Sequence, residues 1–563
     1  MSRIPTLIDL PRLQTPLLSS VPLLRASACP LFLRIAKMAA SSQSSSPAGS
    51  PFYISTAINY ANGPPHMGHA YEAIVADCVA RYHRHYGRDV FFLTGSDEHG
   101  LKIAETAAAQ TPPVKPIELT DLNAGRFQEL NKQLHVSNDR YIRTTEPQHY
   151  EVVQALWRKS AANGDIYLGK YKGWYNTREE AFVTDSEAKQ ANYCDAQTGK
   201  PLVEMEEESY FFRMTKHLPA LVAHLKAHPL FIQPDSARAE VLARLEADEP
   251  RDLSVSRCNF SWGVPVPSND LHPDKPHVMY VWFDALPNYL TGVDYGGAPG
   301  SRAERFWPAN VHLIGKDIVW FHSVIWPCML MSIGEPLPQQ VFCHGFILGP
   351  DGRKMGKSLG NVVDPHTILA KYGADAFRYF LLRETTLGAD LIFSERRLVD
   401  LYNADLLKSF GNLLHRGTSL CQQFCGGKID TEARVEGPFD LQEFRSSIDQ
   451  HYGQLAVLSS VELLIAKIHL TNQWMTHLAP WALKEDPARR SAVVCTLLEA
   501  IFVLTHYLLP IVPDGAQRAF LKFGQGPRRL LDLSAEYKSL AVGTPVVVGA
   551  VLYQAHTFKV LPI

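Results

Sequence analysis

Residues 52–69 read FYISTAINYANGPPHMGH and predict a strand, a loop and the start of a helix. The β-branched and aromatic residues 52–55 favour a strand, and the Gly-Pro-Pro sequence after it favours a loop. From Gly68 onward the apolar residues follow helical spacing, and Gly87 is the expected end of that helix. A helix that begins directly after a strand and a tight loop presents free backbone N–H groups to an anion.

His66 and His69 flank Gly68 at this predicted helix start. Imidazole N–H groups can donate to phosphate oxygens as negative charge develops, and glycine lets a nucleotide approach the backbone. For an isolated pair, two surface histidines would be the preferred interpretation. Lys354 and Lys357 follow a predicted turn far downstream, and lysine is a mobile charge suited to a pyrophosphate leaving group. A solvated basic loop is the alternative for the lysines, but both pieces together favour a triphosphate site.

In this order, residues 65–69 (PHMGH) and 354–358 (KMGKS) resemble the two signatures of class I aminoacyl-tRNA synthetases. The nearest resemblance is to methionyl-tRNA synthetases of the mitochondrial and bacterial type, and it extends over residues 52–535. It implies ATP-dependent attachment of methionine to tRNA(Met) through methionyl-adenylate, with Mg²⁺ accompanying ATP. The implied catalytic residues are His66, His69, Lys354 and Lys357. Gly356 stands where serine is common, so we expect this loop to close less tightly.

The resemblance implies an α/β fold in which a Rossmann-type catalytic domain contains a connective insertion and precedes an all-α anticodon-binding bundle. A chain of 563 residues is too long for one core, which agrees with several domains. The expected boundaries are 1–50 for a transit peptide or disordered segment, 51–165 and 276–350 for the catalytic halves, 166–275 for the connective insertion, 351–402 for the KMGKS loop and stem-contact region, and 403–563 for the bundle. We expect a monomer, because the resemblance leaves no appended dimerisation domain.

The amino-acid site is expected where predicted strands end. Asp97 follows the apolar residues 89–94, and open α/β sheets place ligands just past the carboxyl ends of their strands. Its carboxylate suits an ammonium group, although an acid that caps the next helix is the ordinary alternative. Residues 281–289 form an aromatic cluster that could contact a thioether sulfur, but alone it would more often be core. The resemblance implies methionine binding by Ile58, Tyr60, Asp97, Trp282, Ala285, Leu286, Tyr289 and His322, with proline common in relatives at position 286.

Residues 313–322 again read as strand, turn and helix. Asp317 can accept from ribose hydroxyls, and Gly315 allows close approach of the nucleotide. The implied ATP-binding residues are His66, Gly68, His69, Gly315, Asp317, Lys354 and Lys357.

Many relatives carry zinc on Cys-x-x-Cys knuckles within the connective insertion. Here residues 176–179 are Asn-Thr-Arg-Glu, and Cys194 stands alone. Zinc needs three or four ligands, so we expect no bound zinc. Elsewhere Cys421 and Cys425 are close, but an i,i+4 pair on a helix is more typical of core packing than of ligation. The scattered cysteines favour a reducing compartment without disulfides.

The segment after residue 400 is predicted to be mostly helical. The apolar run 493–509 contains a glutamate and a histidine, which favours a buried bundle helix over a membrane span. Asn412 and Arg416 lie four residues apart and share a helix face, and Trp481 offers a stacking surface for a base. The resemblance implies that these three contact the anticodon. The alternatives are an ordinary helix surface for the polar pair and core packing for the tryptophan.

Residues 1–50 contain five basic residues and one acidic residue and end in a serine-rich stretch. This composition is typical of a mitochondrial or plastid transit peptide, and a disordered tail without an address is the alternative. We expect the mitochondrial matrix, and Met38 is an alternative start for a cytosolic form. Without residues 1–50 the 55 Lys and Arg become 50 and the 57 Asp and Glu become 56, a net charge of −6. A tRNA partner must therefore be met by local basic patches.

Two other functions remain open at this stage. A class I synthetase for leucine, isoleucine or valine would need a large editing insertion, and the insertion here is too short. A cysteine enzyme would be expected to hold zinc. A non-catalytic tRNA-binding protein descended from a synthetase is disfavoured by the intact His66, His69, Lys354 and Lys357.

Overall fold

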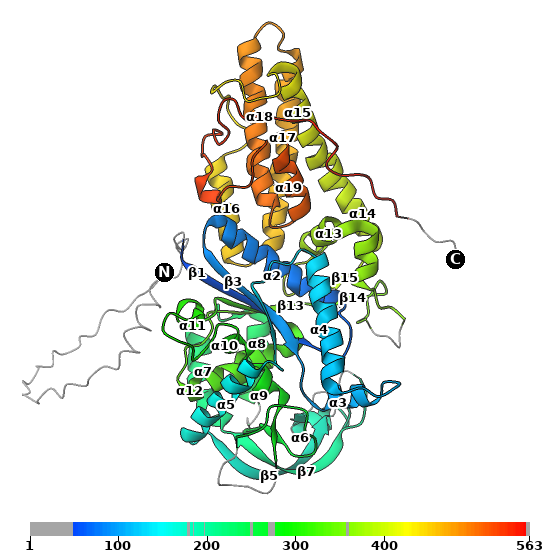
Figure 1. The fold of residues 1–563 in the computed structure, drawn as a ribbon, viewed down its shortest axis with the longest axis vertical. Helices are drawn as coiled ribbons and strands as arrows, with labels where there is room; N and C mark the ends of the chain where they lie inside the picture. The colour runs from blue at the N-terminus through cyan, green and yellow to red at the C-terminus, as the bar shows by residue number, and fades with distance from the viewer. Residues whose placement is uncertain are drawn as a thin grey trace, which may run out of the picture. The chain divides into compact units, whose positions relative to one another are not determined.

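The computed structural model describes residues 49–176, 181–183, 185–195, 198–247, 251–267, 276–355 and 360–558. Within them, an α/β part is built on a parallel sheet and a C-terminal part is helical (Figure 1). The predicted fold class is therefore confirmed.

The central sheet has seven strands in the order β2-β3-β1-β12-β13-β8, with β4 also paired to β3. Every neighbouring pair in it is parallel. The strands are β1 (Pro51–Thr56), β2 (Asn59–Tyr60), β3 (Asp89–Asp97), β4 (Arg140–Arg143), β8 (Ile232–Gln233), β12 (Val311–Gly315) and β13 (Val341–His344). The three strands predicted at 52–55, at 89–94 and at the start of 313–322 are confirmed as β1, β3 and β12, and β3 continues to Asp97. Because all strands run the same way, their carboxyl ends share one edge of the sheet.

Helix α2 (Met67–Tyr86) follows β2 and contacts β1, β3 and β12. Gly87 caps its C-terminus with a left-handed φ of 104°, so the predicted end of this helix is confirmed. The other helices of the α/β part are α3 (Leu101–Ala108), α4 (Pro116–Gln133), α5 (Pro147–Ala162), α7 (Met214–Ala227), α8 (Asp235–Ala247), α9 (Val281–Ala285), α10 (Asn288–Thr291), α11 (Arg302–Phe306) and α12 (Trp326–Ile333). A 3₁₀ turn η1 (Lys316–Ile318) and a π turn η2 (Phe321–Ile325) precede α12.

A separate antiparallel sheet lies in the expected connective insertion. Its order is β6-β5-β7-β9, and its strands are β5 (Ile166–Asn176), β6 (Ala181–Val183), β7 (Val203–Phe212) and β9 (Leu253–Ser254), with the short helix α6 (Asp185–Gln190) after β6. Between β7 and β9 the chain returns to the central sheet, since β8 pairs with β13. Two small pairs complete the strands: β10 (Ser256–Arg257) with β11 (Val278–Met279), and β14 (Ile347–Leu348) with β15 (Leu391–Ile392).

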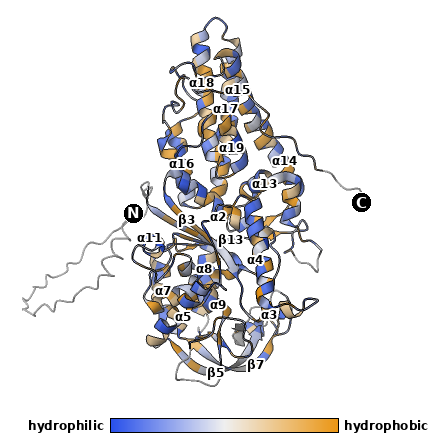
Figure 2. Cartoon of the chain, viewed as in Figure 1, coloured by the Kyte–Doolittle hydropathy of each residue, from blue (hydrophilic) through white to orange (hydrophobic). Residues whose placement is uncertain are grey.

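The helical part begins with α13 (Pro365–Glu384). It continues with α14 (Glu395–Leu401), the π segment η4 (Tyr402–Gly411), α15 (Asn412–Phe424), α16 (Leu441–Gly453), α17 (Val457–Leu478), the 3₁₀ turn η5 (Pro480–Ala482), α18 (Pro487–Leu508), α19 (Pro513–Leu521) and the turn η6 (Leu530–Asp532). Hydrophobic and hydrophilic residues are mixed along these helices (Figure 2). Among the described residues, α18 alone is long and apolar enough to cross a membrane, but 94% of its most apolar window is buried. It packs against α15 and α17, as predicted for a bundle helix.

A buried ion pair joins the two parts. Arg378 of α13 lies 2.7 Å from Asp77 of α2, and neither side chain is exposed to solvent. Arg378 also donates to the carbonyl oxygens of Pro510 and Ile511 in the turn between α18 and α19. Such a pair tolerates burial because further hydrogen bonds satisfy the guanidinium, and loss of one partner typically costs about 3–5 kcal/mol.

Candidate functional site

The predicted phosphate-binding histidines lie at the N-terminus of α2. His66 is the N-cap residue, and its Nδ1 accepts from the backbone N–H of Gly68 at 3.1 Å. In return, His69 Nδ1 accepts from the backbone N–H of His66 at 3.2 Å. The two rings stack with centroids 3.7 Å apart. Glycine at position 68 favours this packing, because a Cβ there would lie 3.0 Å from the His66 ring and would force the ring to shift.

These contacts decide which ring nitrogen carries the proton. Since both Nδ1 atoms accept backbone N–H groups, each neutral ring holds its proton on Nε2 and can donate it outward. The His66 side chain is exposed, yet desolvation by the surrounding atoms lowers its pKa to about 4. Desolvation, helped by His66, lowers the pKa of His69 well below its ordinary value. At neutral pH the pair therefore supplies two neutral hydrogen-bond donors.

Charged groups from the next strands surround His66. Asp317, in the turn after β12, raises the pKa of His66, whereas Lys354 lowers it, so both charges lie close to the ring. The Nζ of Lys354 lies 4.2 Å from the centroid of the Phe346 ring. Asp317 Oδ1 would lie 2.7 Å from a Cβ on Gly315, so the glycine admits the aspartate beside the strand end. The charges of Asp317 and Lys354 thus both act on the histidine pair at the N-terminus of α2.

A second buried pair supports this edge. His344 Nε2 lies 2.8 Å from Glu72 Oε2, which joins the end of β13 to α2. Burial raises the pKa of Glu72. Burial alone would lower the pKa of His344, but the hydrogen bond and charge of Glu72, the Gly345 carbonyl and Asp317 together raise it. Sequence reasoning did not identify this pair, because Glu72 and His344 belong to distant segments and neither stands out in its own motif.

Residues from two segments that are predicted to bind methionine also come together. Trp282 of α9 stacks on Phe321 with centroids 3.8 Å apart and planes at 11°. Tyr289 Oη lies 2.7 Å from His322 Nε2, and His322 Nδ1 lies 3.1 Å from the carbonyl oxygen of Ile318. Because Nδ1 must donate to that carbonyl, Nε2 accepts the Tyr289 hydroxyl. Burial lowers the pKa of His322 to about 4, which keeps this neutral arrangement.

The other residues that are predicted to bind methionine lie around the same sheet edge or in the core beside it. Asp97 is the last residue of β3 and is 8% exposed, and Tyr60 pairs with it between β2 and β3. Ile58 and Tyr60 are half-buried. Ala285 and Leu286 are buried in the hydrophobic core.

A polar network that sequence reasoning missed is centred on Asp284, two residues after Trp282 in α9. Asp284 accepts from His99 at 2.6 Å and from His149 at 2.9 Å, and all three side chains are almost fully buried. Burial alone would raise the pKa of Asp284, but the charges and hydrogen bonds of His99 and His149 lower it. Asp284 sits inside the aromatic segment 281–289, yet its partners lie 185 and 135 residues away in the chain. The network therefore holds α9, and Trp282 with it, against the end of β3.

The predicted anticodon residues lie on the bundle. Asn412 and Arg416 are exposed on one face of α15. Trp481 is 41% exposed, and the guanidinium carbon of Arg416 lies 5.8 Å from the centroid of its indole ring. The structure thus excludes full core burial of Trp481 and places Arg416 beside it.

Some predicted residues lie outside the described ranges. Gly356, Lys357 and Ser358 of the second signature are among them, as are Met38 and residues 177–179. Cys194 is described and is half-buried.

The chain is similar to known proteins over most of its length. The family model described as tRNA synthetases class I (M) matches residues 52–201 and 189–418. A methionine–tRNA ligase of Rhizobium meliloti (strain 1021) is 41% identical over 477 residues, which cover 83% of this chain and 90% of the relative. A methionine–tRNA ligase of Thermotoga maritima is 39% identical over 524 residues, which cover 90% of this chain and 81% of the relative.

Solved structures agree with the sequence comparison. The Mycobacterium tuberculosis methionyl-tRNA synthetase in complex with methionyl-adenylate superposes with a TM-score of 0.83 at 37% identity, covering 89% of this chain and 99% of that one. The apo form of the M. tuberculosis enzyme gives a TM-score of 0.78 at 34% identity, covering 92% and 100%.

Proposed function

This chain belongs to the methionyl-tRNA synthetase family of class I aminoacyl-tRNA synthetases, and we propose that it charges tRNA(Met) in mitochondria with the residues gathered at the carboxyl edge of its central sheet. It is a methionine–tRNA ligase. ATP and methionine form methionyl-adenylate and pyrophosphate, and the methionyl group then passes to tRNA.

The adenylation step requires positioning and charge neutralisation. A methionine carboxylate oxygen attacks the α-phosphorus, and the bond to the bridging oxygen of pyrophosphate breaks. No protein nucleophile is needed. The Nε2–H groups of His66 and His69 donate to phosphate oxygens as charge develops, and Lys354 and Lys357 neutralise the departing pyrophosphate with Mg²⁺. The paired histidines at the N-terminus of α2, with Asp317 and Lys354 close to His66, are the observation that carries this assignment.

Asp97 is proposed to accept the methionine ammonium, since it lies buried at the end of β3. Trp282 forms an aromatic wall for the thioether, because rings offer favourable sulfur contacts. Tyr289 and His322 fix that wall through their shared hydrogen bond. Gly315 and Asp317 are proposed to receive the ribose.

Anticodon recognition is proposed for Asn412, Arg416 and Trp481. An unstacked base can lie on the exposed indole, and the guanidinium and amide can reach base edges or phosphates. A local positive charge at Arg416 is needed because the chain without residues 1–50 is net acidic.

Mitochondrial targeting is proposed from the basic, serine-rich composition of residues 1–50, and a monomeric state from the family resemblance. A fluorescent protein carrying residues 1–50 should enter mitochondria, whereas one that starts from Met38 should stay in the cytosol. Cytosolic retention of the longer fusion would contradict the mitochondrial assignment without touching the enzymatic one.

Pyrophosphate exchange tests the catalytic assignment. We expect methionine, among the twenty standard amino acids, to support exchange of labelled pyrophosphate into ATP. His69→Ala should abolish most of this exchange. Exchange driven equally well by leucine or isoleucine would refute the proposed methionine pocket.

A further inference from the structure

Two cysteines and an aspartate meet in the helical bundle, away from the site described above. Cys425 caps the C-terminus of α15, Cys495 lies on α18, and Asp430 lies on the segment between α15 and α16. Their thiol sulfurs and carboxylate oxygen all lie within 4.8 Å of one another. Cys425 is 4% exposed and Cys495 is fully buried, whereas Asp430 is exposed. Two soft ligands therefore face a carboxylate that solvent can reach.

The spacing of these atoms suits a small tetrahedral cation. Cys495 Sγ lies 3.4 Å from Asp430 Oδ1, and Cys425 Sγ lies within 4.8 Å of both atoms. In a tetrahedral site with Zn–S of about 2.3 Å and Zn–O of about 2.0 Å, neighbouring sulfur and oxygen ligands are about 3.5 Å apart. The Cys495–Asp430 pair therefore already has the separation that a zinc ion replacing the thiol protons would require.

Further polar groups complete the surroundings. Cys421 lies one helical turn before Cys425, and its thiol donates to the carbonyl oxygen of Lys428 at 3.4 Å. Ser491 lies one turn before Cys495, and its hydroxyl donates to Asp430 Oδ2 at 2.9 Å. A water molecule can supply a fourth ligand, and Ser491 orients the carboxylate. Hydrogen bonds of this kind to a ligating carboxylate are typical of metal sites.

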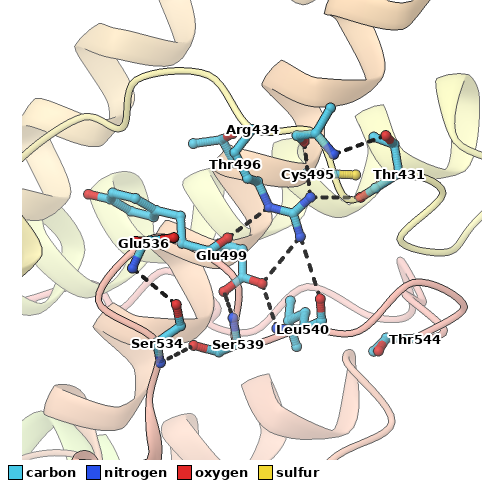
Figure 3. A network of polar contacts seen from close by, with 12 residues as sticks. Thr431, Arg434, Cys495, Thr496, Glu499, Ser534, Glu536, Ser539, Leu540 and Thr544 are labelled. Atoms are coloured by element: carbon cyan, nitrogen blue, oxygen red, sulfur yellow. Dashed lines mark hydrogen bonds and ion pairs between the residues drawn. The ribbon is translucent and has the colours of Figure 1, made fainter.

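A polar network around Arg434, four residues after Asp430, ties the segment between α15 and α16 to α18 (Figure 3). Arg434 donates to the carbonyl oxygen of Thr431 at 2.7 Å and pairs with Glu499 at 3.5 Å. Glu499 is fully buried, lies one turn after Cys495 on α18, and accepts from the backbone N–H of Ser539 at 2.9 Å. Ligands held in place by their neighbours lose little conformational freedom when a metal binds.

We propose that Cys425, Cys495 and Asp430 bind one Zn²⁺ ion, which ties α15 and α18 to the segment between α15 and α16. Thiolate ligands select zinc over magnesium or calcium, so this ion is distinct from the one that accompanies ATP. The proposal departs from the expectation of a zinc-free chain, which rested on ligands close together in sequence. Cys495 lies 70 residues beyond Cys425, and only the packing of α18 on α15 brings them together.

Cobalt titration of the reduced, chelator-treated full chain tests this site. We expect about one Co²⁺ per chain with a thiolate-to-cobalt absorption band, and Zn²⁺ should displace it. Cys495→Ser should abolish the band, and Asp430→Asn should weaken Co²⁺ binding tenfold or more. Cys258→Ser removes an exposed thiol elsewhere in the chain and serves as the matched control, which should keep full binding.

Asp430→Asn keeps the proposal testable if Cys495→Ser fails to fold, because Asp430 is exposed and its loss should leave the bundle intact. Methionine-dependent pyrophosphate exchange by Asp430→Asn should equal that of the unmodified chain, which separates this site from the adenylation site. Absence of the band in the unmodified chain, or unchanged Co²⁺ affinity in Asp430→Asn, would overturn the proposal.

Discussion

At the scale of single residues, protonation explains how the two histidines can serve ATP. An imidazolium would add positive charge, but desolvation keeps His66 and His69 neutral, so they act through directed N–H groups. Their Nδ1 atoms are used by the backbone of α2, which leaves Nε2 for the ligand. The capping of the helix and the donation to phosphate thus use opposite sides of the same rings.

His69→Ala should slow methionine-dependent pyrophosphate exchange by about 100-fold or more, because a dedicated donor to the transition state is lost. Methionine binding without ATP should stay within about twofold, since methionine is assigned to other residues. Stopped assays measure the rate of pyrophosphate exchange, and equilibrium dialysis measures the affinity for methionine. His228→Ala, at an exposed histidine in the inserted segment, is the control and should behave as the unmodified chain. Near-normal exchange by His69→Ala would remove this residue from the mechanism.

Trp282→Ala should raise the KM for methionine by about tenfold or more, because it removes an aromatic wall and leaves Phe321 without its stacking partner. Asp97→Ala should raise the same KM by leaving the ammonium unpaired. The KM for ATP should change little in either variant. Exchange kinetics with each substrate varied in turn provide the measurement, and an equal rise in both KM values would contradict the assignment.

At the scale of elements, buried neutral histidines make the bundle sensitive to acid. His506 on α18 is fully buried; its Nδ1 donates to the carbonyl oxygen of Phe502, and its Nε2 accepts from the backbone N–H of Arg528. Burial lowers the pKa of His506 to about 3. Protonation would break the bond to Arg528 and leave a buried charge.

This lowered pKa determines how the free energy of unfolding changes with pH. In the unfolded chain the pKa of His506 is about 6.5, and above that pH its preference for the neutral form contributes fully to the stability of the folded state. This contribution to stability is lost as the pH falls toward 3. Between pH 6.5 and 5 the free energy of unfolding should fall by about 2 kcal/mol on account of His506. Denaturant unfolding of the unmodified chain and of His506→Gln at both pH values measures this difference. An identical pH dependence in the two proteins would show that His506 does not titrate on unfolding.

At the scale of the whole molecule, the adenylation site and the anticodon face lie on different parts of one chain. The Arg378–Asp77 pair and its contacts to the α18–α19 turn join those parts through buried polar bonds. A defect on the exposed face of α15 should therefore affect tRNA docking without disturbing the histidines on α2.

Trp481→Ala should cut aminoacylation of tRNA(Met) by about tenfold or more, because a stacked base contributes about 1–3 kcal/mol and each 1.4 kcal/mol is a factor of ten. Exchange without tRNA should stay unchanged. The exposure of the indole predicts a melting temperature close to that of the unmodified chain. Parallel losses in aminoacylation and exchange, with an earlier melting transition, would instead indicate that Trp481 stabilises the bundle.

Local patterns in the sequence were sufficient for β1, for the start of β3 and for the limits of α2, whereas β3 continues three residues beyond its predicted end. Strand propensity, Pro-Pro loops and the Gly87 cap act over a few residues, so no distant contact is needed to recognise them. The order of the signatures likewise indicated the family that the comparisons show.

Tertiary packing alone decided the contacts between distant segments. It stacked Trp282 on Phe321, joined Glu72 to His344, and left Trp481 at the surface. These outcomes depend on the register of parallel strands and on which helix faces meet, and both are set by burial summed over the whole chain. The meeting of Cys425 with Cys495 follows in the same way from α18 packing on α15, since spacing along the chain carries no record of it.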